Sequence, residues 1–420
     1  MGKPGWRGAA SPLGIPQFRR LFAARSISYL GDWVALIALA SLVYDETGSA
    51  IASAGLMVAI QVLPAIVAPA LIGRLELGDP RRTLVGLGLL EALAFGALAL
   101  IAENFLLVAV LAIAAADGTL ALSTRALSRA SLSALLAPSG QLRAGNALIN
   151  LGANFAVAAG PVIGGVLVVT IGPGSALLVN AATFLLSALI LATLGDLPSH
   201  LSGEDAADGA ATGWRERLRT GLAYVRRQPQ LARLIAAQAA ALAFFSLTVP
   251  VDVVYANESL GAGDRGFGFL VGAWGLGTII GALLFAGALR FTLPNLIAGS
   301  TLVIGLGYLG LAVAPGLALA CLAAVVGGTG NGVQWVAVVT TIQEMIASSY
   351  QARVVGLLES AASIADAVGF ALGGLIAALV APRVSYLVAG LGVLVVLSAA
   401  FATLRSLGPV RGTADAPVAR

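Results

Sequence analysis

The chain has few charged residues and almost no cysteine or histidine. Charged side chains make up 10% of its 420 residues, whereas an ordinary soluble domain has about 25%. A water-soluble protein of this length cannot cover its surface with so few charges. One cysteine, Cys321, and one histidine, His200, exclude a disulfide framework and a metal site built from several His or Cys ligands. Soluble enzymes, disulfide-rich secreted domains and zinc modules are therefore excluded.

Apolar residues, in contrast, make up 59% of the chain. A helix that crosses roughly 30 Å of hydrocarbon needs about 20 mostly apolar residues. The two longest apolar runs contain turn residues that divide each of them, Gly172-Pro173-Gly174 and Pro315-Gly316. The sequence thus predicts twelve membrane-spanning helices, within 18–44, 47–73, 83–102, 104–124, 144–195 (two), 234–256, 266–289, 291–343 (two), 354–381 and 384–404.

The distribution of basic residues predicts the orientation of these helices. Short cytoplasmic loops retain Lys and Arg. If the N-terminus is inside the cell, nearly all of the 24 basic residues lie on the cytoplasmic side. We therefore expect a multi-pass protein with both termini in the cytoplasm. The basic balance then reflects topology, and no nucleic-acid partner is expected.

The one long polar stretch, 195–233, predicts a cytoplasmic linker between two groups of six helices. Within it, Trp214, Leu218, Leu222 and Val225 share one helical face, which is typical of an amphipathic helix at the membrane surface. The expected organisation is a cytoplasmic tail (1–17), a six-helix bundle (18–194), the linker (195–233), a second six-helix bundle (234–406) and a cytoplasmic tail (407–420).

Several motifs resemble those of bacterial major facilitator superfamily transporters. The N-terminal part contains Phe18-Arg-Arg-Leu-Phe22, Arg25-Ser-Ile-Ser-Tyr-Leu-Gly-Asp-Trp33 and Val43-Tyr-Asp-Glu-Thr-Gly-Ser49. The C-terminal part contains Gly327-Gly-Thr-Gly-Asn-Gly332, followed by Thr340-Thr-Ile-Gln343 and Arg353-Val354. These segments are most similar to the branch that holds enterobactin exporters and macrolide and multidrug efflux pumps.

The resemblance implies an all-α membrane protein with twelve transmembrane helices in two pseudo-symmetric six-helix bundles around a central cavity with alternating access. It implies a secondary active transporter, monomeric, in the bacterial cytoplasmic (plasma) membrane, with a small-molecule substrate, protons and membrane lipids as partners. The leading hypothesis is a proton-coupled exporter of small amphipathic molecules such as a drug, siderophore or metabolite. A lipid or lysophospholipid flippase of the same fold and a non-transporting scaffold or sensor are the alternatives.

Motifs for ATP-binding loops, zinc proteases and nucleophile elbows are missing from the sequence. We therefore expect no enzyme activity, no cofactor and no metal. Energy is expected to come from an ion gradient or from the substrate itself.

Charges inside the membrane are costly, so each one is a candidate functional residue. Asp32 lies mid-span, seven residues and therefore about 10 Å from Arg25 on one helix face. Desolvation favours protonation of such a carboxylate, and contact with water favours its ionisation. With Asp117 and Arg125 of the fourth helix, these residues are expected to form a charged cluster. Proton coupling is assigned to Asp32, Asp117 and Asp366, with a static network of ion pairs as the alternative.

Other charges are expected to form a network or gates, and Glu91 is expected to bond a neighbouring helix. The network and gate residues are Arg25, Arg125, Arg129, Arg81, Arg82, Glu344, Arg353 and Glu359. In the loop after the second helix, Leu77 stands where the superfamily usually has Asp, and either Glu76 or Asp79 is the expected substitute for it.

Small residues and polar or aromatic residues complete the predicted site. A segment similar to the antiporter motif of the superfamily comprises Gly160, Pro161, Gly164 and Gly165. The expected lining of the substrate cavity is Tyr29, Asn154, Gln238, Phe244, Phe245, Asn331, Gln334 and Trp335. Helix packing is the alternative role for each of these residues.

Overall fold

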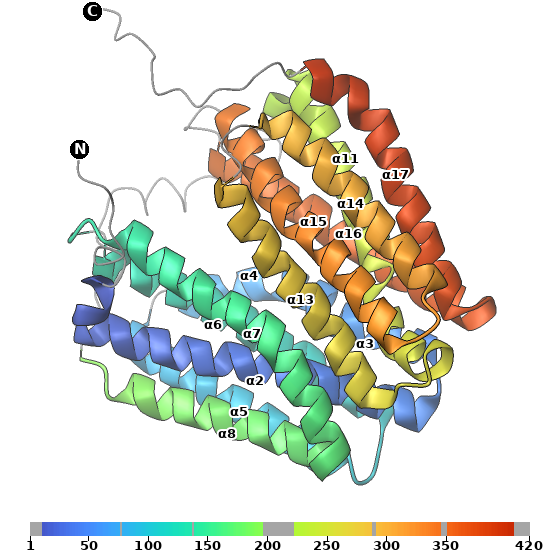
Figure 1. Ribbon diagram of the computed structural model, residues 1–420. Coiled ribbons are helices and arrows are strands. Elements are labelled where there is room, and N and C mark those ends of the chain that lie inside the picture. Colours follow the sequence, from blue (N-terminus) through green and yellow to red (C-terminus); the bar gives the residue numbers. More distant parts are fainter. Residues whose placement is uncertain are drawn as a thin grey trace, which may run out of the picture. The chain divides into compact units, whose positions relative to one another are not determined.

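The computed structural model describes residues 11–75, 78–136, 138–195, 222–287, 291–345 and 351–406, and these residues are almost entirely helical (Figure 1). In this part of the chain, twelve helices are long and apolar enough to cross a membrane, as the sequence predicts. The elements of the N-terminal half are η1 (Ser11–Gly14), α2 (Pro16–Thr47), α3 (Ala50–Met57), η2 (Val58–Val62), α4 (Leu63–Leu75), α5 (Pro80–Ile101), α6 (Leu107–Leu136), α7 (Leu142–Ile171) and α8 (Pro173–Ala192).

The C-terminal half has the same number of spans. Its elements are α11 (Pro229–Ser246), η3 (Val249–Val251), α12 (Asp252–Val254), η4 (Tyr255–Ser259), α13 (Gly263–Gly287), α14 (Leu293–Val313), α15 (Leu317–Met345), α16 (Gln351–Leu379) and α17 (Pro382–Ser406). Most of the predicted amphipathic linker helix lies outside the described residues, and residues 222–226 at its end are helical.

Contacts divide the chain into two compact units. The first unit comprises Met1–Ala211, Pro250–Gly272 and Ala377–Leu379, and the second comprises Thr212–Val249, Ala273–Ile376 and Val380–Arg420. The first unit thus contains the first six spans together with a segment from the later half of the chain. Within it, α2 packs along both α7 and α8, and α5 packs on α8 (Figure 1).

A proline shapes the second span. Pro64 has no N–H, so the carbonyl of Ile60 loses its α-helical donor. The chain forms the π-helical segment η2 at this point, where Leu63 N donates to Val58 O. Gly118 of α6 lies against the Ile60 carbonyl, because a Cβ at residue 118 would come within 2.5 Å of that oxygen. The absence of a side chain therefore lets α6 approach this span at the residue after Asp117.

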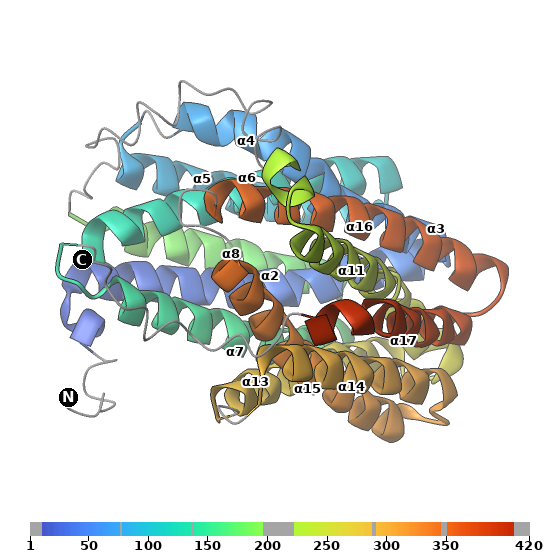
Figure 2. The ribbon, with the colours of Figure 1, turned by 90° about the horizontal axis from the view of Figure 1, so that it is seen from above.

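In the second unit, glycines allow α13 and α15 to pack backbone to backbone. A Cβ at Gly328 or Gly332 of α15 would overlap carbonyl oxygens of α13, and a Cβ at Gly277 or Gly281 of α13 would overlap carbonyl oxygens of α15. Each pair is spaced by four residues and so lies on one helix face. On another face of α15, Gly330 lies against α14, and α14 packs along both α15 and α17 (Figure 2). Close packing through small residues is a principal source of helix association in membranes.

This packing predicts that a methyl group added where α15 contacts α13 destabilises the protein. The variant Gly332→Ala should lower the melting temperature of the purified protein, because the new Cβ overlaps the Thr278 carbonyl and overpacking costs about 1–3 kcal/mol. Gly299→Ala on α14 is the matched control, since a Cβ there meets no atom within 4 Å. The melting temperatures are measured by differential scanning fluorimetry in detergent. Equal values for the two variants would contradict the close packing of α13 and α15.

Candidate functional site

Five ionisable side chains lie close enough to interact inside the first unit. They come from three helices that are far apart in the sequence and are Arg25 and Asp32 of α2, Glu91 of α5, and Asp117 and Arg125 of α6. We refer to these five residues as the charge cluster. The expected grouping of Asp32 and Arg25 with Asp117 and Arg125 agrees with this arrangement, and Glu91 is an additional member.

The interactions within the cluster follow the signs of the charges. Asp32 is attracted by Arg125 and, less strongly, by Arg25. Glu91 is repelled by Asp32 and attracted by both arginines. Asp117 is repelled by Glu91 and Asp32 and attracted by Arg125. Three carboxyl groups share two guanidinium groups, so the fully ionised cluster carries one negative charge in excess.

The members of the cluster differ in their exposure. Glu91 is 1% exposed and Arg25 and Asp117 are also buried, whereas Asp32 is half-buried and Arg125 is exposed. An arginine exposed to lipid at mid-span would cost at least about 2.5 kcal/mol. We therefore expect the side of the cluster that carries Arg125 and Asp32 to face water, with Glu91 behind it in the protein interior.

Hydrogen bonding differs among the buried acids. Thr124 Oγ1 donates to Glu91 Oε1 at 3.2 Å, which confirms the expected bond from Glu91 to a neighbouring helix. Among the described residues, Asp117 Oδ1 is buried without a hydrogen-bond partner. A buried oxygen without a donor is costly. A water molecule at Asp117 would supply the donor, and a proton would remove the cost of burying the negative charge.

The helix that carries Asp32 is held on two sides by close contacts. On one side, Gly31 lies against Asn180 and Thr183 of α8. Two turns before Gly31 on α2 and one turn after Thr183 on α8, the same two helices are joined again, where Ser187 Oγ donates to Ala24 O at 3.0 Å. These contacts fix the position of α2 along the axis of α8.

On its other side, α2 meets the predicted antiporter-like segment of α7. Gly160 lies against Trp33, and Gly164 lies against Val34, the two residues that follow Asp32. Gly165 faces the backbone of α13 at Asp264 and Gly268, and Pro161 O also lies against Gly268. The small residues of this segment therefore position the turn of α2 that carries Asp32.

The remaining predicted residues of the first unit have varied surroundings. The Arg25 guanidinium lies 4.4 Å from the centre of the Tyr29 ring, which is a cation–π contact. Arg81 donates to Ala192 O at the end of α8, where a cation stabilises the last carbonyls. Arg82 and Arg129 are exposed, and Asn154 is half-buried.

Asp79 forms the N-cap of α5, accepting a hydrogen bond from Arg82 N at 2.8 Å. Its carboxylate is thus engaged at the helix start. Glu76 and Leu77 lie outside the described residues.

In the second unit, two of the polar candidates, Asp366 and Gln334, are bonded to neighbouring helices. Ser246 Oγ donates to Asp366 Oδ1, joining α11 to α16. Gln334 Nε2 donates to Thr301 Oγ1 of α14 at 2.9 Å, and Gln334 is buried. Gln238 is also buried, and Asn331 is half-buried.

The aromatic candidates of the second unit differ in their contacts. The Phe245 ring lies 5.9 Å from that of Trp274, and Phe244 lies against Gly392 of α17. Trp335 is 52% exposed. The side chains of Glu344, Arg353 and Glu359 lie outside the described residues.

Comparison with known proteins shows the family of the chain. A family model described as a transmembrane secretion effector of the major facilitator superfamily matches residues 7–358. The chain belongs to this family. It is 24% identical, over 378 residues, to an uncharacterized MFS-type transporter, YfiS, of Bacillus subtilis (strain 168), with 88% of this chain and 89% of YfiS covered. The protein is therefore a multi-pass membrane transporter, and its family and fold point to a non-enzymatic role.

Solved structures confirm the major facilitator fold. The D323A mutant of the nucleoside transporter NupG is 13% identical, with a TM-score of 0.76 over 92% of this chain and 99% of that chain. A D-xylose-proton symporter is 16% identical, with a TM-score of 0.68 over 90% and 96% of the two chains. A bacterial homologue of the human lysosomal transporter Spinster, in an inward-facing and unoccupied conformation, is 13% identical, with a TM-score of 0.69 over 93% and 98%.

The hydrogen bond between Thr124 and Glu91 predicts a specific effect on stability. The variant Thr124→Val should lower the free energy of unfolding by about 1–3 kcal/mol, because it leaves a buried carboxyl oxygen without its donor. The loss should shrink in a Glu91→Met background, which removes the accepting oxygen, and a double-mutant cycle of melting temperatures measures this. Thr119→Val is the control on the same helix, since Thr119 bonds only the backbone of its own helix at Ala115 O. Equal losses in both backgrounds would contradict the pairing.

Proposed function

We propose that the protein is a proton-coupled exporter of small amphipathic molecules and that the charge cluster binds the coupling proton. The observation that carries this proposal is the imbalance of the cluster, in which three carboxyl groups share two guanidinium groups. An uncompensated buried charge costs about 3–5 kcal/mol. One proton on a carboxylate removes the excess charge, and its release restores it.

Exposure divides the roles within the cluster. Asp32 is half-buried beside the exposed Arg125, while Glu91 lies in the interior. Asp32 is then the acid that exchanges protons with water, and Glu91 and Asp117 raise the cost of leaving Asp32 ionised. A change in the hydration of Asp32 during alternating access would alter its protonation. Because α7 and α8 hold the Asp32 turn on both sides, this change in charge acts on the packing of the whole unit.

One observation favours an amphipathic substrate, and another is compatible with proton coupling. The second unit contains half-buried aromatic and polar residues, among them Phe245, Trp274 and Asn331, and sites for such ligands are largely apolar with a few polar groups. Among the fold relatives, one is named as a proton symporter, so the fold is compatible with proton coupling. Asp366, bonded to Ser246, is proposed as a second titrating group.

The proposal predicts that removing one acid of the cluster separates transport from the proton gradient. In energised inside-out membrane vesicles, the wild type should accumulate ethidium and release protons. A coupling free energy of about 1–3 kcal/mol corresponds to a roughly 5–150-fold effect of the gradient. This effect should disappear in Asp32→Asn and Asp117→Asn, while exchange of ethidium without a gradient persists.

Glu103→Gln is the matched control, since Glu103 is an exposed acid after α5, and it should behave as the wild type. Unaltered coupling in both Asp32→Asn and Asp117→Asn would overturn the role of the cluster. Gradient-driven uptake of ethidium by right-side-out vesicles, with none by inside-out vesicles, would overturn export.

A further inference from the structure

A row of buried polar side chains runs along α6 from the charge cluster toward the end of the helix. Its members are Asp117, Thr124, Ser128 and Ser131, spaced by seven, four and three residues. At 100° per residue these positions lie within about 60° of one another on the helix, and the row is about 21 Å long. All four residues are buried.

Two of these side chains lack the hydrogen bond that serine usually makes in a membrane helix. Ser123 and Thr119 donate to carbonyls one turn back, at Thr119 O and Ala115 O respectively. Among the described residues, the hydroxyls of Ser128 and Ser131 are buried without any partner. Hydroxyls on the same helix therefore differ, and within the described part of α6 the buried hydroxyls without a partner are those of Ser128 and Ser131.

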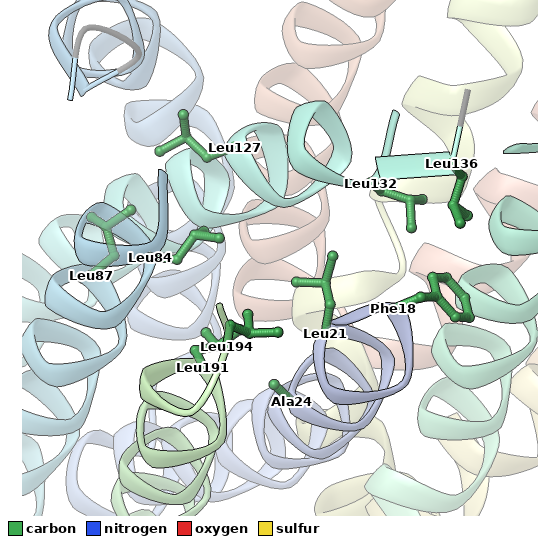
Figure 3. Close-up of a cluster of buried hydrophobic side chains, with 10 residues drawn as sticks. All are labelled: Phe18, Leu21, Ala24, Leu84, Leu87, Leu127, Leu132, Leu136, Leu191 and Leu194. Atoms are coloured by element: carbon green, nitrogen blue, oxygen red, sulfur yellow. The ribbon is translucent and has the colours of Figure 1, made fainter. Parts of the chain in front are cut away.

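No described residue supplies a partner for either hydroxyl. The Leu127 and Leu132 side chains of α6 belong to a buried apolar cluster with Leu84 and Leu87 of α5 (Figure 3). A hydroxyl left unbonded among apolar side chains costs about 1–3 kcal/mol. Buried water molecules commonly satisfy such groups when two or more polar atoms are available to each.

The spacing of the row fits single bridging waters. Ser128 lies one turn beyond Thr124, a rise of about 6 Å, and Ser131 lies about 4.5 Å further along the axis. Two hydrogen bonds through one water span about 5.6 Å. The first hydroxyl of the series, that of Thr124, already donates to Glu91 Oε1, so the row connects to the charge cluster.

We propose that Ser128 and Ser131 bind a file of water molecules that conducts protons between the charge cluster and the Leu136 end of α6. This inference rests on the proposed proton coupling and adds the route by which protons reach and leave the charge cluster. At each step one O–H bond breaks on the donor water and one forms on the next acceptor. The net change is one proton gained or lost by a carboxyl group of the cluster. The groups that face the cluster end of the file are Glu91 from α5, Arg25 and Asp32 from α2, and Asp117 and Arg125 from α6.

The water file is tested directly by a high-resolution structure of the full chain in lipid nanodiscs. We expect ordered water within about 3 Å of both hydroxyl oxygens. Dry density around Ser128 and Ser131, at a resolution that shows water elsewhere in the protein interior, would overturn the proposal. This readout does not depend on any transport activity, so it separates failure of the file from failure of the proposed function.

The conduction of protons is tested with the double variant Ser128→Ala and Ser131→Ala. Positioned proton-transfer groups contribute about 10²–10⁴-fold to rates, so ethidium-dependent proton release should slow by about tenfold or more. The solvent isotope effect in D₂O should rise, which a merely structural change would not cause. Ser123→Ala, which removes a hydroxyl bonded to its own helix, is the control.

The double variant Ser128→Thr and Ser131→Thr keeps both hydroxyls and should retain the wild-type rate. Wild-type rates and isotope effects in the alanine variant would overturn conduction through the row. If the threonine variant were slow and the alanine variant had the wild-type rate, side-chain volume and not the hydroxyls would control the rate. That result would also overturn the proposal.

Discussion

The structure of the first unit depends on keeping five charged groups away from lipid, three of them buried in the protein and two on the side expected to face water. Three carboxyl groups and two guanidinium groups from α2, α5 and α6 share one interior region. Each charge is acceptable at this depth only because opposite charges lie nearby. Since the acids outnumber the arginines, the fully ionised cluster carries one excess negative charge, which the proposed coupling proton would neutralise.

Close packing around the cluster gives this charge balance a mechanical consequence. Gly31 brings α2 against α8, and Gly160 and Gly164 bring α7 against the residues that follow Asp32. Packed interiors do not deform continuously, so a change in charge at Asp32 favours one helix arrangement over another. The row of hydroxyls on α6 leads into the same region and is the path that we propose for the proton.

The spans were predictable because an apolar run of membrane length rarely forms anything other than a membrane-spanning helix. All twelve expected helices are present. The meeting of Asp32 with Arg25 and Arg125 followed from helical spacing and from the family resemblance. The position of Glu91 in the cluster could not be predicted, because no local sequence pattern shows which face of α5 packs against α2 and α6. Ser128 and Ser131 were missed since serine is ordinary in membrane helices, and only the three-dimensional contacts show which hydroxyls are unbonded.

The central claim is that the charge cluster holds one proton that the transport cycle releases. Infrared difference spectroscopy of the full chain in lipid, with ethidium added to the wild type and to Asp32→Asn, tests it most directly. The account predicts a carboxylic-acid band that is lost from the wild type on ethidium binding and is missing from Asp32→Asn. A wild type in which no carboxylic acid changes, or a band that is unaltered in Asp32→Asn, Glu91→Gln and Asp117→Asn alike, would contradict it.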